Sequence, residues 1–365
     1  MLPARRPHFT RPALILTAAL GLLLPGQLTA GVIATDGDVT GSMNAGGTAT
    51  DPADYIIGVG DAVRRDFGGS IFLGAASASS SSHNRLTVRN AATATASDFY
   101  MSALQADTNN TLRLTGSSIF TMRDLFVGYA GGANQVTVEQ ASTLNARTLE
   151  VGLYATSPDN QLLLTGPGST LTATSGIFVG TRGDRGTLTV ANGARLISGG
   201  TSRIGDNAGA DNNTIHVTGR DSVWENSTFV TLRDGNDSRL LITDQGLVTL
   251  GDSLYFGSGT GNFVGLDTGF LAFQGDNLAQ LATWIAEDRF RFWNNATDEW
   301  LTADTDDLSF DYFVNDADAL AFSGYEDLGG YTIITAGSPI PEPAAFAALA
   351  GLAALGLAAS RRRRR

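Results

Sequence analysis

Asn134-Gln-Val-Thr-Val138, Ser142-Thr-Leu144 and Leu149-Glu-Val-Gly152 are three short segments that recur along the chain with small variations. The next copy reads Asn160-Gln-Leu-Leu-Leu164, Ser169-Thr-Leu171 and Ile177-Phe-Val-Gly180. Successive copies begin 26, 24, 26, 26, 27, 25 and 24 residues apart. A period this constant is typical of repeat architectures, in which each repeat is one structural unit. The copies begin at Asn84, Asn110, Asn134, Asn160, Gly186, Asn213 and Ser238, with a possible eighth at Asn262.

Apolar and polar residues alternate within each segment, as Val136 and Val138 do with Gln135 and Thr137. This period of two predicts short β-strands separated by turn-forming residues. Three strands in about 25 residues fit one coil of an all-β solenoid, a parallel β-helix, and parallel crossovers favour a right-handed coil. Stacked coils bury a continuous apolar ladder. We expect its inward positions to include Leu112, Leu114, Val127, Leu188, Val190, Ile204, Leu240, Ile242, Leu254 and Phe256.

Asparagine recurs at the first position of most copies. Stacked side-chain amides there would hydrogen-bond from coil to coil and form an asparagine ladder. Asparagine is also a common turn residue, so the pattern leaves both interpretations open. Both are structural, and the residues concerned are Asn84, Asn110, Asn134, Asn160 and Asn213.

The composition excludes several kinds of chemistry. The 365 residues contain no cysteine and no lysine, since all 24 basic residues are arginine. Disulfides, cysteine nucleophiles, Schiff-base lysines and Walker-type phosphate sites are therefore excluded. The net charge is −12, and residues 31–343 carry 16 arginines against 36 acidic residues, or −20. So acidic a surface repels phosphate backbones, which makes nucleic acid a poor partner.

Residues 1–30 are typical of a secretory signal peptide. Arg5, Arg6 and Arg11 precede an apolar run of about twelve residues, which is too short to span a bilayer, and Ala30 offers a cleavage site for signal peptidase. The alternative is an N-terminal membrane anchor. Residues 31–83 are expected to form an N-terminal cap and a first partial coil, because Ile71-Phe-Leu73 resembles the strand that closes later repeats. Residues 84–261 hold the repeat array.

Residues 262–338 change in character and predict an α+β cap at the C-terminal end of the array. Asp276 is expected to cap a helix from Asn277 to about Asp288. Its apolar face would hold residues 278, 281, 282 and 285. Short strands are expected at residues 271–273, 290–293, 300–301, 310–313 and 331–335.

Residues 339–365 combine a Pro-Glu-Pro triplet, an apolar stretch over 344–360 and an arginine cluster at the end of the chain. This order resembles the PEP-CTERM sorting signal of exported proteins in Gram-negative bacteria. The resemblance implies an inner-membrane anchor through 344–360, then processing by an exosortase and delivery to the outer surface or the extracellular matrix, often with polysaccharide. The alternative is a simple C-terminal membrane anchor. The residues that carry the resemblance are Pro341, Glu342, Pro343, Arg361, Arg362, Arg363, Arg364 and Arg365.

The repeats are similar in pattern to autotransporter-associated β-strand repeats and other parallel β-helices. Together with the tail, this predicts an exported, non-catalytic protein of the cell surface or extracellular matrix, associated with polysaccharide and without a cofactor. The alternative is a carbohydrate-active β-helix enzyme, a polysaccharide lyase or glycoside hydrolase. A calcium-dependent adhesin is a third hypothesis.

Candidate residues for those alternatives each have a simpler structural interpretation. The histidines of the mature chain, His83 and His216, are expected in a loop and on an outward strand position. Glycosidases need two carboxylates on either side of the bond that they cleave, and lyases need positive groups near a uronate. The residues weighed for these roles are Asp206, Asp211, Asp234, Asp237, Arg220, Arg233 and Arg239. For calcium they are Asp304, Asp306, Asp307 and Asp311, and for sugar stacking Trp284, Trp293 and Trp300.

Overall fold

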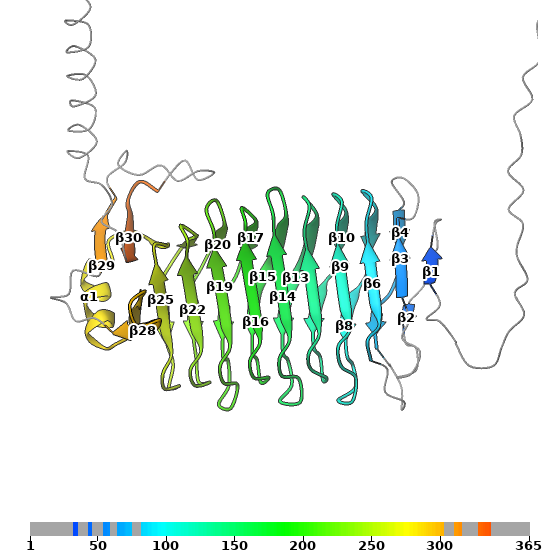
Figure 1. The fold of residues 1–365 in the computed structure, drawn as a ribbon, viewed down its shortest axis with the longest axis horizontal. Coiled ribbons are helices and arrows are strands. Elements are labelled where there is room, and N and C mark those ends of the chain that lie inside the picture. Colours follow the sequence, from blue (N-terminus) through cyan, green and yellow to red (C-terminus); the bar gives the residue numbers. More distant parts are fainter. Residues whose placement is uncertain are drawn as a thin grey trace, which may run out of the picture.

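The computed structural model describes residues 32–35, 43–45, 54–58, 64–74, 82–302, 310–315 and 328–336. These residues form a straight stack of coils, closed at the C-terminal end by a helix and antiparallel strands (Figure 1). Consecutive coils pair in parallel and in register, so the predicted parallel β-helix is confirmed, in agreement with the right-handed winding expected of parallel crossovers. The predicted sorting residues, the predicted signal peptide and Asp304, Asp306 and Asp307 lie outside the described residues.

The first strand of each coil belongs to one long sheet. Neighbouring strands in this sheet lie about one period apart in the sequence, as in the pairing of Val136 with Leu162. In sheet order the strands are β1 (Val32–Thr35), β3 (Asp54–Ile57), β6 (Arg85–Val88), β9 (Thr111–Leu114), β12 (Gln135–Val138), β14 (Gln161–Thr165), β16 (Thr187–Ala191), β19 (Thr214–Thr218), β22 (Arg239–Thr243), β25 (Phe263–Asp267), β27 (Phe290–Asn294) and β28 (Glu299–Thr302).

The second strands line another face of the coil, and most of them are only three or four residues long. In two coils the second and third strands are continuous, which gives the longer β13 and β15. Their pairing shifts by one residue between Ala146 and Thr148, so a local irregularity replaces the turn. The second strands are β4 (Arg64–Asp66), β7 (Thr93–Thr95), β10 (Ile119–Thr121), the first part of β13 (Thr143–Val151) and of β15 (Thr170–Val179), β17 (Arg195–Ser198), β20 (Val223–Asn226), β23 (Leu247–Leu250) and β26 (Phe270–Gln274).

The third strands complete the coil. As expected, Ile71-Phe-Leu73 pairs in parallel with the strand one coil later. Together with β3 and β4 it forms a coil before the first clear repeat. The third strands are β2 (Met43–Ala45), β5 (Ile71–Leu73), β8 (Asp98–Met101), β11 (Asp124–Val127), the second part of β13 and of β15, β18 (Ser202–Ile204), β21 (Val230–Leu232) and β24 (Leu254–Phe256).

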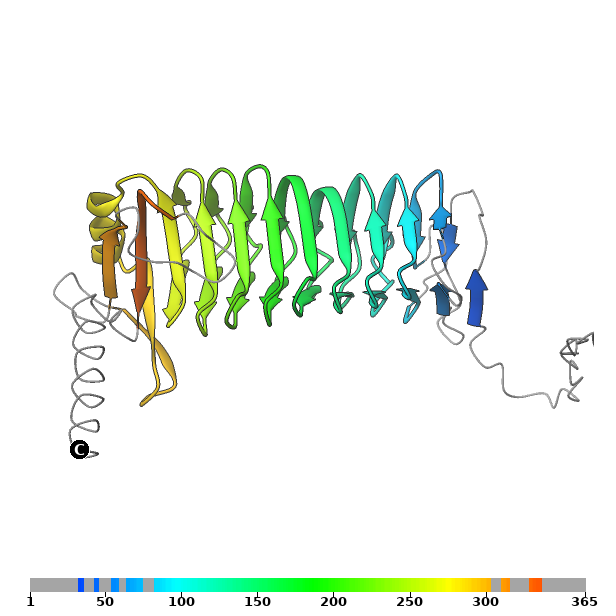
Figure 2. The same cartoon turned by 90° about the horizontal axis from the view of Figure 1, so that it is seen from above.

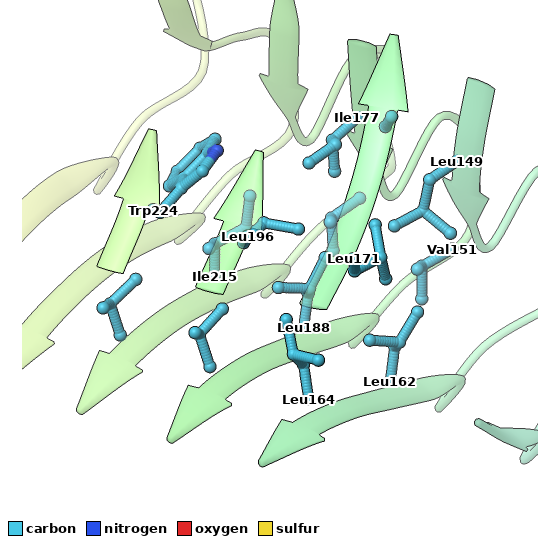
Figure 3. Packing of buried hydrophobic residues seen from close by; sticks show 14 of the residues in the cluster. Leu149, Val151, Leu162, Leu164, Leu171, Ile177, Leu188, Leu196, Ile215 and Trp224 are labelled. Carbon is cyan, nitrogen blue, oxygen red and sulfur yellow. The ribbon is translucent and has the colours of Figure 1, made fainter. Parts of the chain in front are cut away.

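The core is the column of inward side chains that fills the coil along its length (Figure 3). All the predicted inward residues are fully buried except Phe256, which is half-buried at the edge of the core. Burial of apolar area at about 25 cal/mol per Å² makes this ladder the main stabilising contribution. Trp224 is also part of this core, and its Nε1 donates to the Ser198 hydroxyl at 3.0 Å inside the coil.

The asparagine ladder is confirmed. Asn84, Asn110, Asn134, Asn160 and Asn213 are fully buried. Where asparagines follow one another, the Oδ1 of one accepts the backbone N–H of its counterpart one coil earlier, at 2.9 to 3.1 Å. Gly186 and Ser238 interrupt the series, but their own N–H groups still donate to the asparagine that follows.

The residue just before the ladder position is left-handed in coil after coil. His83, Asn109, Ala133, Asp159, Arg185, Asn212 and Asp237 have φ between 53° and 63°. A second corner carries the buried serines 118, 142, 169 and 222. The hydroxyls of residues 142, 169 and 222 accept backbone N–H groups of the preceding coil, such as Gly193 N at 3.0 Å, and the hydroxyl of residue 118 donates to the Val88 carbonyl at 3.0 Å.

The C-terminal end differs from the coils because its added strands run antiparallel. Figure 2 shows the β27–β28 hairpin extending from the rod and α1 (Leu278–Ala286) lying across its end. The strands β29 (Phe310–Val314) and β30 (Tyr331–Ala336) pair with each other, and β30 pairs with β26. The helix is shorter than predicted. Asn277 occupies the N-cap position, and Asp276 Oδ1 accepts the Leu278 N–H at 3.1 Å. None of the helices among the described residues is long and apolar enough to cross a membrane.

Candidate ligand-binding surface

His83 and His216 lie on coils that are far apart in the stack, and both occupy structural positions. His83 is the exposed left-handed residue before Asn84. His216 points outward from β19, as the alternation predicted, and its Nε2 lies 2.9 Å from the Thr243 hydroxyl. Burial lowers the pKa of His216, so the ring favours its neutral form at neutral pH. The two rings do not share a site.

The three arginines considered for uronate binding sit at different points of the coil. Arg220 is exposed in the turn after β19, and Arg239 lies on β22 with its guanidinium 5.9 Å from the ring of Phe263. Arg233 follows β21 and forms an ion pair with Asp206 at 2.6 Å. The three arginines therefore lie at different positions of the coil, as the sequence predicted.

The four aspartates considered for hydrolysis are engaged separately. Asp206 lies between Arg203 and Arg233, at 3.4 and 2.6 Å. The carboxylate of residue 211 accepts the N–H of residue 236 at 2.7 Å, and residue 234 accepts both the N–H and the hydroxyl of residue 258. Asp237 has a φ of 53° in the turn before Ser238. Backbone and ion-pair roles account for this set.

The cap residues divide between core and surface. Trp284 is 7% exposed and packs against Phe256, Phe273 and Phe290, so it serves the cap core as predicted. The rings of residues 293 and 300 lie 5.2 Å apart, half-buried on the β27–β28 hairpin. Asp311 is exposed on β29. Among the described residues, no group of three His, Cys, Asp or Glu side chains is placed to hold a metal ion.

A different surface gathers the aromatic residues of the array, on the outward side of the third strands. Phe72, Tyr100 and Phe126 occupy equivalent positions of β5, β8 and β11. Their rings stack almost in parallel, with centroids 5.0 and 4.9 Å apart and interplanar angles of 9° and 10°. The same register continues through Glu150, Phe178 and Arg203. We refer to these outward residues, Phe72, Tyr100, Phe126, Glu150, Phe178 and Arg203, as the aromatic column.

Two tyrosines from the following turns widen the column. Tyr129 meets Tyr100 and Phe126 edge-on, with centroids 5.2 and 5.5 Å apart, and Tyr154 meets Tyr129 at 5.1 Å. The two tyrosine hydroxyls lie 3.4 Å apart. This hydrogen bond, with burial, raises the pKa of Tyr129 to about 12. Tyr154 is 38% exposed and offers the most accessible ring of the group.

Ion pairs border the aromatic column on its other side. Arg123 donates to Asp98 at 2.6 Å and to Asp124 at 3.2 Å, and Arg147 donates to Asp124 at 2.7 Å. The two aspartates are buried, while the arginine side chains are about half exposed. Each aspartate therefore has a guanidinium of its own coil or the next. At the far end of the column, the guanidinium of Arg203 lies 5.6 Å from the ring centroid of Phe178.

The sequence contained part of the information needed to find this surface. Alternation with the inward Leu125 and Val127 already places Phe126 outward, and the same holds for Glu150 between Leu149 and Val151. The missing information was which outward positions of different coils stand above one another. That depends on the register between coils, which the pattern within one strand does not fix.

The aromatic column can hold a ligand that has both apolar and hydroxyl faces. Within the stack the rings cover one another's faces. Contact is therefore offered by ring edges, by the end of the stack at Phe126, whose next neighbour in register is Glu150, by the exposed ring of Tyr154 and by the tyrosine hydroxyls. Such amphipathic rings suit ligands that have both apolar surface and hydrated polar groups. Comparisons with family models, with curated proteins and with solved structures find no match.

Proposed function

We propose that the protein is an exported, non-catalytic component of the cell surface or extracellular matrix that binds polysaccharide along the aromatic column. The observation that carries the proposal is the continuous outward series of Phe72, Tyr100 and Phe126, extended by Tyr129 and Tyr154. A β-solenoid of this kind is compatible with a structural or adhesive role.

A rigid rod suits a linear polymer because its binding groups recur at a fixed spacing. Stacked coils repeat about every 4.8 Å, so neighbouring side chains of the column contact successive parts of one extended chain. Sugar rings present C–H faces to aromatic side chains and hydroxyls to polar ones. Nucleic acid is disfavoured as the polymer because the chain carries a net charge of −12.

The ends of the chain support export by their sequence. In this proposal, signal peptidase removes residues 1–30, and residues 344–360 hold the chain in the inner membrane until an exosortase acts near Pro341, Glu342 and Pro343. Mass spectrometry of material from the cell surface tests the processing. A C-terminus near Pro343 is expected, and a surface form that still ends at Arg365 would contradict exosortase cleavage.

Binding is tested with the purified full chain and a panel of neutral, acidic and amino polysaccharides. At least one polymer is expected to bind, and Tyr154→Ala is expected to weaken it about tenfold, since truncating an aromatic contact residue costs about 1–2 kcal/mol. Leu163→Ala is the matched control, because Leu163 is equally exposed, at 38%, but lies on β14 in the other sheet. The absence of binding to every polymer, or an equal effect of the two substitutions, contradicts the proposal.

The second candidate function is a carbohydrate-active enzyme acting on the same surface. It is favoured by Glu150, because burial raises the pKa of this carboxyl, as a general acid requires. New reducing ends or unsaturated uronates released from the polysaccharide panel, and lost in Glu150→Gln, would establish this function and overturn the non-catalytic one.

A further inference from the structure

Glu150 is the one acidic side chain in a column otherwise made of aromatic rings and one arginine. In register it stands between Phe126 on one neighbouring coil and Phe178 on the other. It also lies close enough to Tyr129 for its charge to raise the pKa of that phenol. A carboxylate on the outer surface of the rod is thus flanked by aromatic side chains and is half-buried.

The charge of Glu150 has no basic partner among the described residues. Its hydrogen bond is with the Thr181 hydroxyl, at 3.2 Å. The other acids of this surface, Asp98, Asp124 and Asp206, each have an arginine within 2.7 Å. The surrounding guanidinium groups are therefore already paired, whereas Glu150 is left for a cation from outside the chain.

We propose that Glu150, with Phe126, Phe178, Tyr129 and Tyr154, binds the ammonium group of an amino sugar in a polysaccharide. This deepens the function proposed above and rests on it, because it names the class of polymer: one whose amino groups are free rather than acetylated. Poly-glucosamine is the simplest chemistry of this kind.

Two physical effects favour an ammonium group at this position. Aromatic ring faces attract cations through their quadrupole, and the attraction grows as the site becomes desolvated. A carboxylate held away from water gains more from an ion pair than an exposed one does, because the local dielectric constant is lower. The acidic charge of the whole chain adds long-range attraction for a polycation.

The sugar rather than a basic peptide is favoured by the hydroxyls that border the carboxylate. The phenols of Tyr129 and Tyr154, 3.4 Å apart, and the hydroxyl of Thr181 supply donors and acceptors for the ring hydroxyls of a pyranose. The exposed ring of Tyr154 supplies a face for its C–H groups. Lysine side chains offer an ammonium group but no such hydroxyls.

Binding should depend on pH in two opposite ways. The titratable groups that face Glu150 are Tyr129, Asp124 and Asp206. Burial raises the pKa of Glu150, and the charges of the two aspartates raise it further, while the hydrogen bond with Thr181 acts in the opposite direction. Acid therefore weakens binding as Glu150 is protonated, and alkali weakens it as the sugar amine loses its proton. A maximum between the two is expected.

The test uses the purified full chain, isothermal titration calorimetry at low salt and slightly acidic pH, and three probes: glucosamine hexamer, N-acetylglucosamine hexamer and hexalysine. The glucosamine hexamer is expected to bind at least about tenfold more tightly than either of the others. Glu150→Gln is expected to abolish that preference while keeping the far-UV circular dichroism spectrum. The control is Glu139→Gln, which removes a carboxylate paired with Arg113 on the other sheet and should leave the preference intact.

Equal binding of the two sugar hexamers, or a preference that survives Glu150→Gln, overturns the ammonium site. Equal binding of hexalysine overturns the choice of an amino sugar. If a neutral or acidic polysaccharide binds and loses affinity in Tyr154→Ala, the proposed function stands and only this inference fails. If no saccharide binds at all, the proposed function fails with it.

Discussion

Replacing Asn134 by alanine tests whether the asparagine ladder stabilises the rod. Asn134 is fully buried. Its Oδ1 accepts the Asn110 backbone N–H at 3.1 Å and the Ser102 hydroxyl at 2.7 Å, and its Nδ2 donates to Gly131 O at 3.0 Å and to Asn160 Oδ1 at 2.9 Å. The substitution removes all four hydrogen bonds at once.

The cost can be worked out from the partners that remain. The Ser102 hydroxyl can rotate, and the Oδ1 of Asn160 keeps the backbone N–H of residue 134 at 3.0 Å. The Asn110 N–H and the Gly131 carbonyl lose their side-chain partner, and a buried polar group left unsatisfied costs about 1–3 kcal/mol. Asn134→Ala is therefore expected to lower the free energy of unfolding by about 2–6 kcal/mol.

The assay is urea denaturation followed by circular dichroism, with hydrogen exchange at the Asn110 amide as a local measurement. Asn145→Ala is the matched control, because that side chain points outward and makes one long bond of 3.3 Å to Thr121; it should change stability by less than about 0.5 kcal/mol. If the two variants unfold at the same urea concentration and the Asn110 amide stays protected, the ladder does not stabilise the coil and the reasoning is wrong.

Three further predictions concern single positions. Gly180→Ala should destabilise the fold by about 2–5 kcal/mol, because φ is 74° and the new Cβ would lie 2.0 Å from Asn213 Nδ2; Gly209→Ala, at φ 84° with open space around it, should cost only about 1 kcal/mol in the same denaturation assay. Ala133→Asn should stabilise by about 0.5–1 kcal/mol, because alanine adopts φ 57° there and asparagine tolerates the left-handed region better; a lower midpoint would contradict this. Glu150→Gln should raise the melting temperature at pH 7 but not at pH 4. Burial raises the pKa of Glu150 in the folded state above its value in the unfolded state. The stability present below the unfolded-state pKa is therefore lost as pH rises through the folded-state pKa, whereas glutamine stays neutral and loses none. A variant that is no more stable at pH 7 would refute that sign.

The sequence was informative where structure depends on local order. The period and the alternation around Val136 and Val138 were enough to predict the coil, its inward residues and the outward direction of His216. The cap strands near Phe290 and Tyr331 were also predicted, because they too are short apolar runs. The helix was predicted too long by a residue or two at each end, since helix ends depend on capping contacts such as that of Asp276 with Leu278.

The choice between a ladder and a mere turn residue at Asn134 required the structure, because the partner of its amide comes from another coil. The aromatic column required it for the same reason. Phe126, Glu150 and Phe178 lie 24 and 28 residues apart, and a one-residue shift near Ala146 sets which of their neighbours align. Outward direction is therefore a property of one strand and follows from its sequence, whereas a shared surface is a property of the register between coils, which only the tertiary structure decides.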